Sequence, residues 1–304
     1  MRPGIGIDLG GTRIKALAYD LDNDRELETR LPPTRDGETI EGSPAWASAI
    51  RELIANWESE WGCRAEVIGI SAPGLAARDG SGITHMPGKL EGIECFPWTE
   101  YLGREKKVIV LNDAHAALIG EVWKGAARDM KDVILLTLGT GVGGAVVTEG
   151  RLLRGHFGKG GHLGHASLDF YGDPDICGMP GALEDMIGNH NVRERSNGRY
   201  ESTRDLVEAV KKGEEHALEV WDRSVRALAV AVASFVNVLD PELVLIGGGI
   251  SEAWDEIGER LKNWMDEFEW RPGGGQVEIR RAALGAMAGA YGAAYFAMQR
   301  YDKV

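Results

Sequence analysis

Cysteine, long apolar runs and positive charge are all scarce in this 304-residue chain, and each scarcity excludes a class of protein. The three cysteines, Cys63, Cys95 and Cys177, are odd in number and widely spaced, so they predict no disulfide framework and indicate a reducing compartment. The longest apolar stretch, residues 227–239, is too short to span a bilayer, and the first residues lack the apolar core of a signal peptide. We therefore expect a cytoplasmic protein with no membrane partner.

The charge balance excludes a nucleic-acid groove. Lys and Arg number 34 against 47 Asp and Glu, which gives a formal net charge of −13. Proteins that bind nucleic acid gain affinity by neutralising phosphates with a basic face, and this chain has no such excess. A small anionic ligand stays possible, because backbone amides and a metal ion can hold phosphates inside an acidic protein.

Glycine, in contrast, is abundant, with 42 residues or about twice the average usage. Predicted strands and helices mix along the whole chain, which indicates an α/β protein. Residues 7–12 (IDLGGT) and 136–141 (LTLGTG) both place a Gly/Thr turn between two predicted strands. This internal repeat predicts two duplicated lobes, each with a glycine hairpin; the alternative is two unrelated hairpins.

The glycine turns predict phosphate binding of an uncommon kind. Residues 139–144 fit the G-x-G-x-x-G template, but a strand and hairpin follow where a dinucleotide fold needs a helix, and the chain has no P-loop motif. Bare backbone in a strand–turn–strand unit can instead form a concave anion site. The candidate phosphate-binding residues are Gly10, Gly11, Thr12, Thr137, Gly139, Thr140 and Gly141.

Two acidic residues and a third glycine cluster complete the candidate site. Asp8 ends the first strand, where a carboxylate can hold Mg²⁺; the alternative is that it only caps the turn. Asp113 stands where a strand enters a helix, and is the candidate catalytic residue; the alternative is that Asn112 and Asp113 only cap the helix. Gly247, Gly248 and Gly249 separate a strand from a helix and would let a flat ligand lie against the backbone.

Seven segments together resemble the ROK family of sugar kinases within the actin-like ATPase superfold. They occur in the family's order at residues 5–19, 71–74, 110–121, 135–147, 161–168, 177–184 and 246–251. The resemblance implies a two-lobed actin-like ATPase (ribonuclease H-like) α/β fold with a cleft between the lobes. It places the small lobe at residues 1–111 with a C-terminal helix at 287–304, and the larger lobe at 112–286 with a sugar-site insertion at 155–189.

The resemblance also implies ATP-dependent phosphorylation of a hydroxyl on a hexose or hexose-like sugar, in a homodimer. Asp113 would be the general base, and the two Gly/Thr hairpins with Asp8-bound Mg²⁺ would hold the ATP phosphates. Gly247 to Gly249 would lie on the adenosine side. The residues implied to bind the sugar are Gly74, Asn112, His162, His165 and Glu184.

Three departures from the family pattern bear on substrate and metal. His162 stands where the family usually has a glutamate that accepts sugar hydroxyl bonds, and His115 replaces the second asparagine of the NDAN motif. Of three family zinc cysteines only Cys177 is kept, with Asp175 and Ala182 at the other two positions. Structural zinc usually needs four N or S ligands, so we expect no zinc site.

These departures leave several functions open. The sugar is unspecified, with an N-acetylated hexosamine, mannose and fructose as alternatives to glucose, and polyphosphate is an alternative donor to ATP. A non-catalytic sugar-binding or regulatory member of the family is a further alternative. The family's repressors carry a helix-turn-helix segment before the lobes, whereas here the first glycine loop begins near residue 8, so we expect no repressor.

Overall fold

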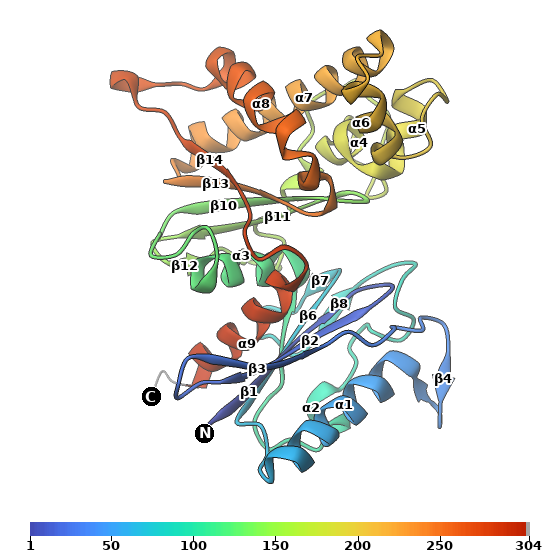
Figure 1. The fold of residues 1–304 in the computed structure, drawn as a ribbon, viewed down its shortest axis with the longest axis vertical. Coiled ribbons are helices and arrows are strands. Elements are labelled where there is room, and N and C mark those ends of the chain that lie inside the picture. Colours follow the sequence, from blue (N-terminus) through green and yellow to red (C-terminus); the bar gives the residue numbers. More distant parts are fainter. Residues whose placement is uncertain (302–304) are drawn as a thin grey trace. The chain divides into compact units, whose positions relative to one another are not determined.

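The computed structural model describes residues 1–301 and divides into two compact units (Figure 1). The first unit contains residues 1–129, residues 154–160 and the chain from Leu284 onward. The second unit contains residues 130–153 and 161–283. No helix among the described residues combines the length and apolar character needed to cross a membrane.

The first unit is built on a five-stranded sheet whose parallel strands end at one edge. The sheet has the order β3-β2-β1-β6-β9. Its strands are β1 (Pro3–Leu9), β2 (Ile14–Asp20), β3 (Arg25–Arg30), β6 (Val67–Ala72) and β9 (Ile109–Asn112). Strands β6 and β9 run parallel to β1, with Asp8 beside Ser71 and Ala72 beside Asn112. The carboxyl ends of parallel strands are where open α/β sheets bind ligands, so this edge is the first place to look for a site.

Helices cover both faces of this sheet (Figure 1). Helix α1 (Ala45–Trp61) packs its buried Trp46 and Ile50 against Ile5 and Ile7 of β1. The opposite face carries α9 (Ala288–Tyr301), which lies unusually close to the strands. A Cβ at Gly6 would stand 1.9 Å from the carbonyl oxygen of Ala290. Glycine in the strand therefore lets the backbone of the helix rest directly on the sheet.

Glycines also bring α3 (Asp113–Lys124) against α9. A Cβ at Gly292 would stand 1.7 Å from the carbonyl oxygen of Ala116, and one at Gly120 would stand 2.3 Å from that of Ala288. Because of this packing α3 belongs to the first unit, which differs from the predicted lobe boundary between residues 111 and 112. The predicted C-terminal helix at 287–304 is observed as α9, and residues 302–304 lie outside the described part.

Short elements fill the connections of the first unit. They are β4 (Thr39–Ile40), β5 (Ser43–Pro44), β7 (Leu75–Ala76), β8 (Ile83–His85) and α2 (Trp98–Tyr101).

The second unit repeats the same sheet topology, with the order β12-β11-β10-β13-β14. Its strands are β10 (Val133–Leu138), β11 (Val142–Thr148), β12 (Arg151–Leu152), β13 (Leu243–Gly247) and β14 (Glu278–Arg281). As in the first unit, a hairpin is followed by two strands parallel to its first arm. The predicted internal duplication is confirmed, and the α/β fold class with it.

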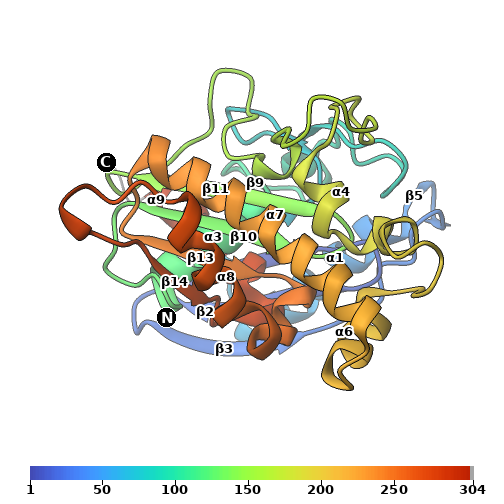
Figure 2. The same ribbon diagram turned by 90° about the horizontal axis from the view of Figure 1, so that it is seen from above.

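Two long helices lie over one face of the second sheet (Figure 2). Helix α7 (Glu215–Leu239) and helix α8 (Trp254–Phe268) bury Trp221, Leu228 and Ile257 together with Leu136 and Ile246 of the strands. The remaining helices are α4 (Leu183–Ile187), α5 (Val192–Arg195) and α6 (Thr203–Lys211). Short 3-10 turns lie at Leu163–His165, Asn189–Asn191, Gly249–Ala253, Pro272–Gly274 and Gly285–Met287.

Replacing Gly292 by alanine tests the glycine contact between α3 and α9. In an exposed helix this change would stabilise the protein by up to about 1 kcal/mol. Here the new methyl group meets the Ala116 carbonyl, so we expect a loss of about 2–3 kcal/mol in the free energy of unfolding, measured by urea denaturation. The matched control is Gly275→Ala, where the nearest atom lies 3.9 Å away and the change should be within about 0.5 kcal/mol. A stabilised Gly292→Ala protein would contradict the close packing.

Candidate functional site

Asp8 lies at the carboxyl end of β1 with both carboxylate oxygens engaged. One oxygen accepts a hydrogen bond from Ser71 Oγ at 2.8 Å, and the other lies 2.7 Å from Lys15 Nζ. Lys15 is the direct cross-strand neighbour of Asp8 in the β1–β2 hairpin. Gly289 of α9 abuts the same carboxylate, since a Cβ there would stand 2.8 Å from Asp8 Cγ. Sequence reasoning missed Lys15 and Ser71, although counting outward from the glycine turn would have paired Lys15 with Asp8.

Asn112 caps helix α3 and orients its neighbours. Its side-chain oxygen accepts hydrogen bonds from the backbone N–H groups of Ala114 at 3.0 Å and His115 at 3.2 Å. Its amide nitrogen donates to the Gly74 carbonyl at 3.0 Å and to Asp113 Oδ1 at 2.9 Å. Asn112 therefore caps the helix, and its expected contact with the sugar stays a prediction. All its strong hydrogen-bonding capacity is used within the protein, so it holds Asp113 and Gly74 in place.

Asp113 is the one acidic side chain at this edge with a resolved upward pKa shift. Burial, followed by the negative charge of Asp8, raises the pKa of Asp113 to about 6, although hydrogen bonds from Ala114 and Asn112 oppose the shift. The residue is nevertheless accessible to solvent. An accessible carboxylate with a raised pKa is suited to accepting a proton near neutral pH.

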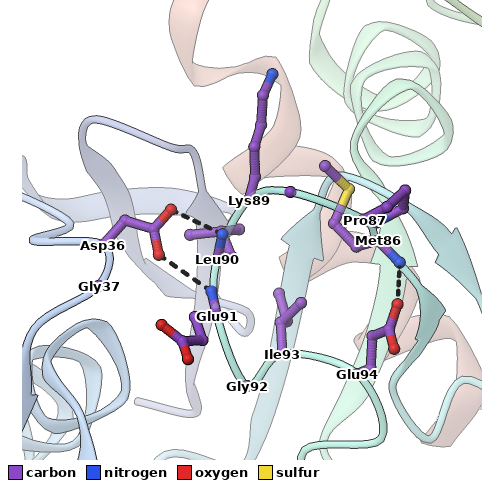
Figure 3. A pocket seen from close by; sticks show the side chains of 11 residues that line it. Asp36, Gly37, Met86, Pro87, Lys89, Leu90, Glu91, Gly92, Ile93 and Glu94 are labelled. Carbon is purple, nitrogen blue, oxygen red and sulfur yellow. Dashed lines mark hydrogen bonds between the residues drawn. The ribbon is translucent and has the colours of Figure 1, made fainter. Parts of the chain in front are cut away.

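Gly74 connects this edge to a hollow on the surface of the first unit (Figure 3). Gly74 has a φ of 99°, and a Cβ there would stand 2.8 Å from Cβ of Met86, one of the lining residues. The hollow is lined by residues 36–37 and 86–94. The Asp36 carboxylate accepts hydrogen bonds from the backbone N–H groups of Leu90 at 2.7 Å and Glu91 at 3.1 Å, which fixes the loop.

The two glycine turns present backbone donors that the protein itself leaves free. In the β1–β2 turn, Gly10 N–H donates to the Arg13 carbonyl, whereas no acceptor within residues 1–301 pairs with the N–H groups of Gly11 and Thr12. In the β10–β11 turn, Gly139 N–H donates to the Gly141 carbonyl at 2.9 Å. Free N–H groups on glycine turns are the donors that an anion site requires.

Hydrogen bonds within the second unit hold the carbonyl groups of its glycine turn. The carbonyl oxygens of Gly139 and Thr140 accept hydrogen bonds from the N–H groups of Asn189 and His190, both at 2.9 Å. The His190 ring also bridges the Thr140 carbonyl and the Asp185 carboxylate, each at 2.7 Å. These bonds fix the carbonyl groups of the turn, while no acceptor within residues 1–301 pairs with the N–H groups of Thr140 and Gly141.

The three glycines at 247–249 differ in how much space surrounds each of them. Gly247 pairs with Thr137 in the β10–β13 register, so the cluster adjoins the second glycine turn. Gly248 has a φ of 82°, and a Cβ there would stand 2.3 Å from the Leu138 carbonyl oxygen, which is a structural reason for glycine. Gly249 has nothing within 4 Å of such a Cβ. Gly249 is therefore the member of the cluster that leaves room for a ligand.

Glu184 and His165 are brought together beside the same turn. A Cβ at Gly141 would stand 2.4 Å from Glu184 Oε2, and Val142 N–H donates to that oxygen at 3.4 Å. His165 Nδ1 lies 3.4 Å from Glu184 Oε1. His162 directly precedes the 3-10 turn that carries His165 and is half-buried. The sequence-predicted sugar residues of the second unit thus lie on one turn and the helix next to it.

The donors at the family's zinc position do not fit that metal. His165, Asp175 and Cys177 bring three ligand atoms within 4.8 Å of one another, and Ala182 supplies none. Asp175 lies 2.9 Å from the ring's Nδ1, but Cys177 Sγ lies 3.8 Å from Nε2, so the two donors face different ring nitrogens. Tetrahedral zinc would also separate the nitrogen and oxygen by roughly 3.3 Å, given bonds of about 2.0–2.2 Å. At 2.9 Å they form a hydrogen bond instead.

Replacing Asp8 by asparagine tests the electrostatics of Asp113. Removing the charge of Asp8 removes a repulsion that disfavours the ionised form of Asp113, so we expect the pKa of Asp113 to fall from about 6 toward the ordinary value of about 4. The measurement is a carboxyl-carbon NMR titration of the full chain. In the control, Asp129→Asn removes an exposed carboxylate and should leave the titration unchanged. A pKa of Asp113 near 4 in the unaltered protein would refute the crowding of these carboxylates.

Comparisons with known proteins agree with this geometry. The sequence pattern of the ROK family matches residues 4–300. The chain is 33% identical to a glucokinase of Thermotoga maritima, with 97% of each chain covered. It is 31% identical to an N-acetylmannosamine kinase of Escherichia fergusonii, with 82% of this chain and 84% of that protein covered.

A solved structure gives the same result for the fold. The ROK family glucokinase of Streptomyces griseus, determined in complex with glucose and AMPPNP, is 29% identical to this chain. It matches with a TM-score of 0.76 over 98% of this chain and 99% of its own. The two-lobed actin-like ATPase fold expected from the sequence is confirmed, and the chain belongs to the ROK family.

Proposed function

We propose that this ROK-family protein is a sugar kinase that transfers the γ-phosphoryl group of ATP to a hydroxyl of a hexose or hexose-like sugar. The observation that carries the proposal is Asp113, an accessible carboxylate of raised pKa at the start of α3 and beside Asp8. Relatives named as sugar kinases over most of the chain support it, and the relative solved with AMPPNP supports ATP as donor.

Asp113 acts as the general base in this proposal. Phosphoryl transfer requires an oriented hydroxyl and an acceptor for its proton, but little covalent chemistry from the protein. The Asn112 amide and the Ala114 N–H both donate to Asp113 Oδ1, so this oxygen is fixed and Oδ2 is left to receive the proton. With a pKa near 6 the group is ionised at neutral pH, yet more basic than an ordinary aspartate.

The glycine turns and Lys15 would bind the donor phosphates. The free N–H groups of Gly11 and Thr12, with the corresponding turn at Thr140 and Gly141, are suited to phosphate oxygens. The Asp8 carboxylate has the hard oxygen donors that Mg²⁺ takes, and each oxygen keeps a lone pair beyond its bond to Lys15 or Ser71. Asp8 would hold that ion, which neutralises charge on the transferring phosphates when it is bound.

The sugar would be bound by groups that differ from the family pattern. Glu184 and His165 supply acceptors and donors for hydroxyls, while His162 replaces a carboxylate with a ring that donates at one nitrogen when neutral. A site built on polar partners rejects substrates that leave those partners unmatched. Glucose, mannose, fructose and N-acetylated hexosamines therefore all belong in the test, as does polyphosphate as donor. The expected homodimer and cytoplasmic location remain predictions.

A coupled ADP-release assay over these sugars, with polyphosphate tested as a second donor, examines the proposed activity. We expect turnover of at least one sugar, and a loss of about 10²- to 10⁴-fold in kcat for Asp113→Asn, which removes the base. Asp129→Asn, an exposed position in the same unit, should retain full activity. Undiminished turnover in Asp113→Asn would remove Asp113 from the mechanism. Sugar binding without turnover by the unaltered protein would favour the non-catalytic, regulatory alternative.

The pH profile gives an independent test of the base. A base must be deprotonated to act, and the pKa of Asp113 is raised to about 6, so activity should be lost as the pH falls through that value. We expect kcat/KM to fall about tenfold for each pH unit below about 6, since one proton on the free enzyme abolishes activity. A profile that stays flat down to pH 4 would contradict the assignment.

A further inference from the structure

Asp175 is a buried carboxylate with a full set of partners inside the sugar-site insertion. Its side chain has no exposed surface. One oxygen accepts hydrogen bonds from the N–H groups of Cys177 and Met179, both at 2.8 Å. The other oxygen lies 2.9 Å from Nδ1 of His165. Burial raises the pKa of Asp175, but the hydrogen bonds from Met179 and His165 outweigh it and lower the pKa overall.

The same carboxylate organises the loop around it. The Asp175 N–H donates to the Met179 carbonyl at 2.9 Å, and the Gly178 N–H donates to the Asp175 carbonyl at 2.9 Å. The turn over residues 175–179 is therefore held by hydrogen bonds within its own backbone and by hydrogen bonds to the Asp175 carboxylate. A bound metal could tie such a loop in the same way, but the donors present here face different nitrogens of His165.

We propose that Asp175 is a positioning residue that takes the place of the zinc ion: it fixes the 175–179 turn and holds the His165 ring with its proton on Nδ1. The carboxylate only accepts hydrogen bonds, so the ring nitrogen facing it must carry a hydrogen. In the neutral ring, Nε2 is then an acceptor for a hydroxyl hydrogen of the substrate. This inference rests on the proposed sugar site for its functional consequence, but not for the tautomer itself.

Glu184 strengthens the assignment of the tautomer. Its Oε1 lies 3.4 Å from the same Nδ1, is buried, and has no other hydrogen-bond partner among residues 1–301. Two carboxylates therefore face one ring nitrogen, and both favour a hydrogen there. Within residues 1–301, the hydrogen-bond partner of Nε2 is the Cys177 thiol at 3.8 Å, and a thiol is a weak donor.

Asp175→Asn separates the two roles of the carboxylate. The amide oxygen can keep the bonds from Cys177 and Met179, so the turn should persist, but the NH₂ group then faces His165 and requires an acceptor at Nδ1. A carboxylate-to-amide change behind a histidine reverses the tautomer in this way. Glu184 Oε1 is farther from Nδ1 than the side chain at position 175, at 3.4 Å against 2.9 Å, so the nearer amide sets the tautomer in the variant. We expect nitrogen NMR of the full chain to report the Nδ1–H form in the unaltered protein and the Nε2–H form in Asp175→Asn. Their melting temperatures should agree within a few degrees.

The kinetic consequence should appear in substrate affinity. With Nε2 converted from acceptor to donor, we expect KM for the best sugar of the assay panel to rise about tenfold or more, while KM for ATP changes less than twofold. Asp173→Ala is the matched control, because this exposed aspartate lies in the same loop and should leave both KM values unchanged. If no sugar is turned over, the proposed function fails while the tautomer measurement still decides the role of Asp175.

Metal analysis completes the test. We expect the unaltered protein to contain much less than one zinc per chain and to keep its His165 signals after chelator treatment. One tightly bound zinc per chain, or an Nε2–H ring in the unaltered protein, would overturn the proposal. So would an Asp175→Asn protein in which neither the tautomer nor the sugar KM has changed.

Discussion

The negative charge of Asp8 acts on Asp113 at the edge of the first sheet, where burial is the larger cause of the raised pKa of Asp113. The two are near enough for the charge of Asp8 to raise the pKa of Asp113. Asp8 is balanced by a cation and a hydroxyl, Lys15 and Ser71, whereas Asp113 receives amide donors from Asn112 and the helix start. The two like groups therefore have different surroundings, which is the kind of difference that separates the roles of paired carboxylates in enzymes.

The duplicated sheets share a topology but differ in chemistry. In the repeat, Thr137 of β10 occupies the position that Asp8 occupies in β1, and both hairpins place a glycine turn next to it. A neutral hydroxyl and a carboxylate at matching positions give the two copies different charge next to their glycine turns. The second copy instead fixes its turn through loop amides and the His190 ring.

Local patterns predicted the strands, the glycine turns, the repeat and the family. Partners distant in sequence were not predicted. Nothing local in the sequence shows that the Asn112 amide donates to the Gly74 carbonyl. The predicted lobe boundary lies before α3, whereas glycine contacts hold α3 in the first unit against a helix more than 160 residues later. Asp175 was considered only as a doubtful metal ligand, because its real partners depend on how the loop closes.

Helix α9 has a consequence for the order in which the chain folds as it is synthesised. Gly289 lies against Asp8, and α9 rests on β1 and α3, so the first unit lacks part of its interior until residues 288–301 have left the ribosome. The second unit, between residues 130 and 283, is translated in full before then. Domains generally fold as units during synthesis. We therefore expect the second unit of the nascent chain to fold first. The amino-terminal strands reach their final packing only when α9 has been synthesised.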